Sequence, residues 1–186
     1  MKRNGKARNE VLMAGIGGMG VLVAGQVLLE SASHSYEHVS YISSYGFARR
    51  GGLCECTVII SDDKIASPVI DQAGVVMLLD SSQFAGFEHR VRPRGIIIAD
   101  TAGFTAERRR DDYTLYTLPC LEAAQSMGSI LGKNLIMLGA YVVITGAVSP
   151  EQIEDELRSR YRDKEKVLKQ NVDAFRRGVE MGRSAA

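Results

Sequence analysis

The sequence predicts an α/β protein built on a doubly wound, mostly parallel sheet, with helices on both faces and a helical extension at the C-terminus. Short apolar stretches, typical of buried strands, alternate along the chain with longer stretches of helical periodicity. The first strand, residues 10–14, is followed by a glycine-rich turn at 15–20 and by a helix at 21–33. Doubly wound domains commonly begin with such a strand–turn–helix unit.

The remaining elements continue the alternation of strands and helices. Further strands are expected at residues 39–43, 53–61, 75–80, 95–100 and 113–118. Further helices are expected at residues 82–91, 121–127, 134–145, 149–161 and 164–181. The fifth of these six helices has a clear start, because Ser149 can cap it and Pro150 suits its first position. Only a short loop separates the second and third strands, which leaves open a locally antiparallel pair in the sheet.

Length and composition fit a single domain. The 186 residues are expected to form an α/β core over 9–147 and a helical extension over 148–186, where the composition becomes charged. A net charge of +1 gives no indication of binding to nucleic acid or to a membrane surface. The basic first eight residues lack the apolar stretch of a secretory signal, and the apolar run at 135–148 is too short to span a bilayer. We therefore expect a cytoplasmic protein.

Residue types that usually bind metals or react as nucleophiles show no such pattern here. Cys54 and Cys56 share one face of a predicted strand, and with Cys120 they form no C-x-x-C pair, which favours small buried side chains. The three histidines lack ligand spacing. Residues 108–112 are three arginines followed by two aspartates, which predicts a surface loop whose opposite charges compensate one another. No metal site is expected, and no catalytic residue can be assigned.

The glycine turn after the first strand is the first candidate binding site. Its spacing matches a dinucleotide fingerprint, and the residues assigned to it are Gly15, Gly17, Gly18, Met19 and Gly20. Glycines let the backbone approach a ligand closely, and free N–H groups at a helix start attract an anion. A turn without any ligand is the alternative interpretation.

The second predicted strand argues against NAD as the ligand of this turn. An NAD-binding or flavin-binding domain uses an acidic residue at the end of that strand to hydrogen-bond the ribose. Here the strand ends in a serine pair followed by Tyr45 and Gly46, and the acidic Glu37 precedes the strand instead of following it.

The loop that follows the second strand is the second candidate binding site. The residues assigned to it are Ser44, Tyr45, Gly46, Arg50, Gly51 and Gly52. The loop starts at the carboxyl end of a strand, where open α/β sheets bind ligands. An arginine pair followed by two glycines can bind a phosphate or carboxylate in a bidentate manner. A solvated arginine pair in a flexible loop is the alternative.

Three further polar positions have simpler explanations. Asn134 precedes the apolar stretch of a predicted helix and is expected to be its N-cap. Asp80 and Asp100 each end a predicted strand and could face a ligand cleft, although aspartate is also common in turns.

Together these segments resemble the gamma subunit of 2-oxoacid:ferredoxin oxidoreductases. The resemblance rests on Gly15-Ile-Gly-Gly-Met-Gly-Val, on Ser44-Tyr-Gly with Arg50-Gly-Gly, on Ile65-Ala-Ser-Pro and on Asn134-x-x-Met-Leu-Gly-Ala. Their order and spacing match the family over most of the chain. Phe47 and Ala48 depart from the Pro-Glu of many members, and small residues there also occur in the indolepyruvate branch. The 2-oxoacid therefore stays open.

The resemblance implies a subunit of an enzyme complex. Members of this family oxidatively decarboxylate a 2-oxoacid, pass electrons to ferredoxin and form an acyl-CoA. Thiamine diphosphate with magnesium lies between alpha and beta subunits, and 4Fe-4S clusters are held by beta and a ferredoxin-like delta subunit. Gamma is a Rossmann-like domain that packs on this core and helps to enclose coenzyme A.

For this chain the resemblance implies coenzyme A at the complex interface, next to the glycine turn and the arginine loop. No cofactor is expected to bind tightly to the chain alone. The isolated chain is expected to be inactive and able to form a homodimer. Two alternatives remain at this stage: a stand-alone nucleotide-binding protein or redox sensor, and a purely structural assembly subunit.

Overall fold

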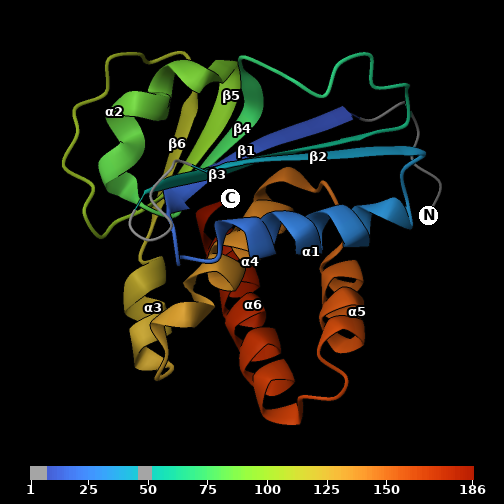
Figure 1. Ribbon diagram of the computed structural model, residues 1–186. Helices are drawn as coiled ribbons and strands as arrows, with labels where there is room; N and C mark the ends of the chain where they lie inside the picture. Colours follow the sequence, from blue (N-terminus) through green and yellow to red (C-terminus); the bar gives the residue numbers. More distant parts are fainter. Residues whose placement is uncertain (1–7, 46–51) are drawn as a thin grey trace.

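A six-stranded sheet forms the centre of the protein (Figure 1). The computed structural model describes residues 8–45 and 52–186. The strands are β1 (Arg8–Ile16), β2 (His38–Tyr45), β3 (Leu53–Ser61), β4 (Ala73–Leu78), β5 (Val91–Asp100) and β6 (Thr114–Leu118). They lie side by side in the order β2-β3-β1-β4-β5-β6.

The sheet is mixed, with one antiparallel strand. β1, β4, β5 and β6 pair in parallel, whereas β3 is antiparallel to both of its neighbours, β1 and β2. The α/β class is therefore confirmed. β2 and β3 form the antiparallel pair that the short loop between them allowed. β3 also separates β1 from β2, which the sequence did not indicate.

The helices are distributed unequally over the two faces of the sheet. They are α1 (Val21–Ser33), α2 (Phe84–Phe87), α3 (Cys120–Ser126), α4 (Lys133–Thr145), α5 (Pro150–Arg160) and α6 (Glu165–Ala185), with 3-10 turns η1 (Ser81–Gln83), η2 (Glu88–Arg90) and η3 (Ile130–Gly132). The five longer helices lie on one side of the sheet, and α2 lies on the other (Figure 1). Within the described ranges, no helix combines the length and apolar character that crossing a membrane would need.

The predicted helix at 82–91 is the expectation that differs most from the structure. Only four residues form an α-helix there, and a 3-10 turn lies on each side of them. Gly86 is a poor helix former, and Val91 already belongs to β5, where it pairs with Ala73 of β4.

Alternation along the central strands divides the core into two parts. Val11 and Met13 of β1 face the layer of longer helices, whereas Leu12 and Ala14 face the side of α2. The larger part joins the sheet to α1, α4 and α6, and Phe175 of α6 is completely buried in it. The division into a core over 9–147 and an extension over 148–186 stays a prediction.

Candidate functional site

The carboxyl ends of the parallel strands meet at one edge of the sheet. β1 ends there at Ile16, β4 at Leu78 and β5 at Asp100. β2 ends at the same edge, because it and β1 are both antiparallel to β3. The two candidate loops of the sequence both start from this edge, where open α/β sheets bind ligands.

The turn between β1 and α1 depends on glycine. Gly18 has a φ of 103° and Gly20 a φ of 77°, in the left-handed region that side chains disfavour. The N–H of Gly17 donates to the carbonyl of Gly52 at 2.9 Å, and the N–H of Met19 donates to Ile16 at 3.1 Å. Among the described residues, nothing lies within 4 Å of a Cβ on Gly18.

Gly15 and Met19 have roles within the fold. A Cβ on Gly15 would lie 3.1 Å from side-chain atoms of both Leu79 and Val21, so glycine lets α1 pack closely against the sheet. The side chain of Met19 is partly buried against the larger core. Any ligand contact from Gly15 would therefore come from the backbone.

The start of α1 has no side-chain cap among the residues that the structure describes. Its N-cap is Gly20, no described side chain accepts a hydrogen bond there, and the first turn contains no acidic residue. The first N–H groups of an α-helix have no carbonyl partner within the helix, and they form the positive end of its dipole. This position is therefore suited to an anionic ligand.

Asn134, which is distant from this turn in the sequence, contacts it in the structure. Its Nδ2 donates to the carbonyl of Gly20 at 3.1 Å, and the residue is only 5% exposed. Its Oδ1 is buried and has no hydrogen-bond partner among the described residues. A Cβ on Gly20 would lie 2.5 Å from Nδ2, so glycine at position 20 also makes room for this contact. The structure thus places an unused acceptor beside the uncapped helix start.

The expectation that Asn134 caps its own helix is wrong. α4 begins at Lys133 and its N-cap is Gly132. The 3-10 turn η3 runs directly into α4 and carries its own cap, because the side chain of Ser129 accepts from the N–H of Leu131. The Asn134 side chain is therefore not needed at the helix start and bonds to Gly20 instead.

The two strand-terminal aspartates serve the fold. Asp100 is completely buried, forms an ion pair with Lys133 (2.7 Å between Oδ2 and Nζ) and accepts the N–H groups of Ala102 and Leu121. It thereby anchors the starts of α3 and α4 at the end of β5. Asp80 caps η1 through a 3.0 Å hydrogen bond from the N–H of Ser82.

One end of the arginine loop contacts the glycine turn, and the other end lies one strand further away. Ser44 is exposed and pairs with Glu55 of β3, and Tyr45 follows it at the end of β2. Gly52, at the other end of the loop, bonds to Gly17. Three assigned residues lie outside the described residues: Gly46, Arg50 and Gly51. A contact between the arginine and a ligand stays a prediction.

The cysteines are buried and free. Burial raises the pKa of Cys56 and of Cys120 to about 12, and it also raises the pKa of Cys54. Such thiols stay protonated near neutral pH and react poorly, which disfavours a redox sensor. In the part of the chain that the structure describes, no group of three or more His, Cys, Asp or Glu residues could hold a metal ion.

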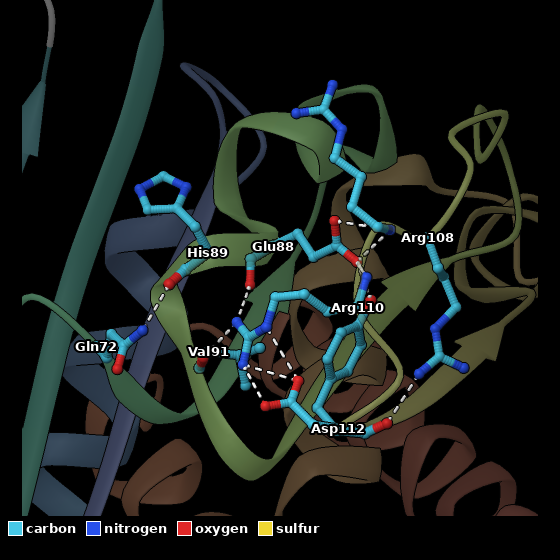
Figure 2. Close-up of polar contacts among 9 residues, drawn as sticks. Gln72, Glu88, His89, Val91, Arg108, Arg110 and Asp112 are labelled. Carbon is cyan, nitrogen blue, oxygen red and sulfur yellow. Dashed lines mark hydrogen bonds and ion pairs between the residues drawn. The ribbon is translucent and has the colours of Figure 1, made fainter.

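A second polar cluster lies at the opposite edge of the sheet, where β5 begins (Figure 2). The Glu88 carboxylate accepts the N–H groups of Arg109 and Arg110 and the hydroxyl of Tyr113 at 2.7–3.1 Å. Arg110 pairs with Asp112, and its Nη1 donates to the carbonyl of Glu88. The charges of residues 108–112 thus neutralise one another in part. The buried carboxylate of Glu88, which the sequence did not indicate, also accepts hydrogen bonds from their backbone.

This geometry defines an open α/β domain in which a glycine-rich turn at the carboxyl edge of the sheet leads into a helix start that no described side chain caps. The chain belongs to the family described as pyruvate ferredoxin/flavodoxin oxidoreductase, which matches residues 10–181. The ketoisovalerate oxidoreductase subunit VorA of Methanothermobacter marburgensis is 32% identical over 93% of this chain. The chain spans only 36% of that relative's length.

Solved structures share this fold over nearly the whole chain. The keto/oxoacid ferredoxin oxidoreductase gamma subunit of Geobacter sulfurreducens is 27% identical, with a TM-score of 0.81 over 96% of this chain and 98% of its own. The 2-oxoglutarate:ferredoxin oxidoreductase of Magnetococcus marinus, solved with 2-oxoglutarate, coenzyme A and succinyl-CoA, has a TM-score of 0.88 at 20% identity. It matches 96% of this chain and 32% of its own, and this likeness establishes the fold alone.

Proposed function

We propose that this chain is the gamma-type subunit of a 2-oxoacid:ferredoxin oxidoreductase, which forms an acyl-CoA from a 2-oxoacid and passes the electrons to ferredoxin. Membership of the family and the likeness to the Geobacter gamma subunit support this proposal. Alpha, beta and ferredoxin-like delta subunits are the proposed partners. We assign thiamine diphosphate, magnesium and the 4Fe-4S clusters to those partners, and the complex to the cytoplasm.

Within that complex, we propose that the start of α1 binds a phosphate of coenzyme A. The observation that carries this proposal is the helix start, which no described side chain caps and at which a Cβ on Gly18 would meet no described atom within 4 Å. Phosphate oxygens accept hydrogen bonds and carry the negative charge that a helix start favours. The Magnetococcus protein shows that a protein with this fold can be part of an enzyme that binds coenzyme A.

Asn134 adds a second kind of contact to this proposal. Its Oδ1 accepts hydrogen bonds and lacks a donor among the described residues. Coenzyme A carries hydroxyl and amide N–H groups as well as phosphates, so one molecule can satisfy both this acceptor and the helix N–H groups. The same side chain holds the Gly20 carbonyl, and it thereby keeps the turn in place. In this proposal, this chain positions coenzyme A, and the partner subunits catalyse the reaction.

Replacing Gly18 tests this role. A Cβ at Gly18 strains a backbone with a φ of 103° and projects from the turn on which the ligand would lie. We expect Gly18→Ala to weaken coenzyme A binding to the assembled complex at least about tenfold, because a hydrogen bond to a charged group contributes about 1.5–3 kcal/mol. Isothermal titration calorimetry on the purified complex measures this affinity.

Gly146→Ala is the matched control. Gly146 also has a positive φ, 62°, and no described atom within 4 Å of a Cβ, but it ends α4, at the opposite end of that helix from Asn134. This variant also places alanine at a positive φ, and it should keep the affinity of the wild-type complex. Equal coenzyme A affinities of the Gly18→Ala and Gly146→Ala complexes would contradict the proposed site. A native preparation in which this chain is active alone would favour the stand-alone nucleotide-binding protein.

A further inference from the structure

A pocket of about 270 Å³ lies at the amino edge of the parallel strands, opposite the edge that carries the glycine turn. Three arginines line it: Arg8 at the beginning of β1, and Arg92 and Arg94 near the beginning of β5. Among the described residues, Glu10 is the only acidic residue of this lining. We call these four residues and the space between them the arginine pocket. The proposed function makes no use of it.

β5 bulges where it contributes to the arginine pocket. One residue of β4, Gly74, lies opposite four residues of β5, 92–95, because the pairing of the two strands shifts register there. A Cβ on Gly95 would lie 2.8 Å from the carbonyl oxygen of Arg92, so glycine at position 95 lets the chain fold back on itself. Bulges re-aim side chains, and they are common at the edges of sheets and next to functional sites.

Within this bulge, Arg94 has a backbone conformation that side chains disfavour. Its φ is 62°, and in the described ranges it is the only residue other than glycine with a positive φ. Its N–H donates to the carbonyl of Asp112 at 2.5 Å, which helps to hold this conformation. The residue is exposed, and its side chain has no hydrogen bond or ion pair with the described residues. Backbone strain of this kind is common in segments that clamp a ligand.

Glu10 anchors the other two arginines and leaves most of their donors unused. Its side chain is 2% exposed; one carboxylate oxygen accepts from Nε of Arg8 at 2.8 Å, and the other accepts from Nη2 of Arg92. A guanidinium has five N–H donors, so each of these contacts uses one of five. Three arginines against one glutamate also give the lining a net charge of +2.

We propose that the arginine pocket binds a small divalent oxyanion, which is a phosphate group or a dicarboxylate. Two negative charges would balance the net charge of the lining, and several acceptor oxygens would satisfy the unused guanidinium donors. A volume of about 270 Å³ lies just below the roughly 300–1,000 Å³ of pockets that hold drug-sized ligands, which favours a small anion over a nucleotide. This inference does not depend on the proposed function.

Arg94→Gln tests the proposal. The substitution removes one positive charge and breaks no side-chain contact among the described residues, whereas a change at Arg92 would take a partner from the buried Glu10. We expect the variant to bind inorganic phosphate at least about tenfold more weakly than the wild-type chain, because a charge-assisted contact is lost. Isothermal titration calorimetry measures this affinity. Phosphate should also raise the melting temperature of the wild type more than that of the variant.

Arg109→Gln is the matched control. Arg109 is also exposed, and its side chain also has no partner among the described residues, but it lies outside the arginine pocket. The substitution changes the net charge by the same amount. This variant should keep the phosphate affinity of the wild type, so a general effect of charge would weaken both variants equally.

Titration with succinate in place of phosphate distinguishes the two sources of the anion, because the one that binds more tightly identifies the ligand class. Equal phosphate affinities of the Arg94→Gln and Arg109→Gln variants would overturn the proposal. The absence of saturable binding of either anion to the wild type would also overturn it. Phosphate binding that Gly18→Ala abolishes and Arg94→Gln leaves unchanged would place the anion at the glycine turn and exclude the arginine pocket.

Discussion

Glu88 is a carboxylate that the fold keeps both buried and ionised. Burial alone would raise its pKa, but hydrogen bonds from the Tyr113 hydroxyl and from the N–H groups of Arg109 and Arg110 outweigh burial and lower the pKa. An unfolded glutamate has a pKa of about 4.3. Because the folded pKa lies below this value, the stabilisation is present at higher pH and is lost as pH falls through the folded pKa.

Glu88→Gln should therefore destabilise the protein mainly at pH values above the folded pKa of Glu88. We expect the free energy of unfolding to fall by about 1–3 kcal/mol near neutral pH, because an amide cannot accept all three hydrogen bonds. Near pH 3 the difference from the wild type should shrink. Urea unfolding at both pH values measures it, with the exposed Glu107→Gln as control. A difference between variant and wild type that does not change with pH would contradict this account.

Asn134 and Glu88 show where residue roles escape sequence reasoning. An asparagine before an apolar stretch is a good N-cap signal, and nothing local distinguishes a cap from a contact with Gly20, which is 114 positions away. Glu88 is an acid followed by the polar His89 and Arg90, and nothing local indicates that residues 108–113 contact it. The positive φ of Gly18 and Gly20, in contrast, could be expected, because their place between a strand and a helix requires glycine.

At the scale of elements, the crossing of α4 and α6 is set by glycines. A Cβ on Gly178 would lie 1.8 Å from the carbonyl oxygen of Ile136, and one on Gly139 would lie 2.3 Å from that of Phe175. No side chain fits at either position, so the two helix backbones are in direct contact.

Gly178→Ala should consequently destabilise the protein although alanine favours helices. The two helices must separate to admit one methyl group, which costs about 1–3 kcal/mol of overpacking and exceeds the propensity gain of about 1 kcal/mol. Gly86→Ala is the control, because no described atom lies within 4 Å of a Cβ on this helical glycine. Its melting temperature should equal or exceed that of the wild type. A Gly178→Ala variant as stable as Gly86→Ala would refute the close crossing.

Elements with strong local signals were predicted best. The start of α5 agrees with the structure, where Ser149 and Gln152 form a reciprocal capping box and Pro150 occupies the first turn. The helix at 82–91 was not predicted correctly, because Val91 pairs with β4, and pairing between distant strands overrides local helical preference.

At the scale of the whole molecule, the position of β3 separates this protein from dinucleotide-binding domains. In those domains the second strand lies next to the first, and an acid at its end reaches the ribose. Here β3 lies between β1 and β2, so the two strands stand roughly 10 Å apart instead of about 5 Å. The missing acid could be seen in the sequence, but the strand order could not, because a short loop is compatible with either arrangement.

Supplying the missing acid should therefore not create an NAD site. Ser44→Asp places a carboxylate near the end of β2, at an exposed position that pairs with Glu55 of β3. We expect both the wild-type complex and this variant to bind NAD no more tightly than about 1 mM, because the new carboxylate is one strand too far from the glycine turn. Calorimetric titration with NAD measures the affinity, and the Gly146→Ala complex is a control for nonspecific effects. A tenfold gain in NAD affinity in Ser44→Asp would mean that the end of β2 reaches the ribose despite β3, and that strand order does not exclude a dinucleotide.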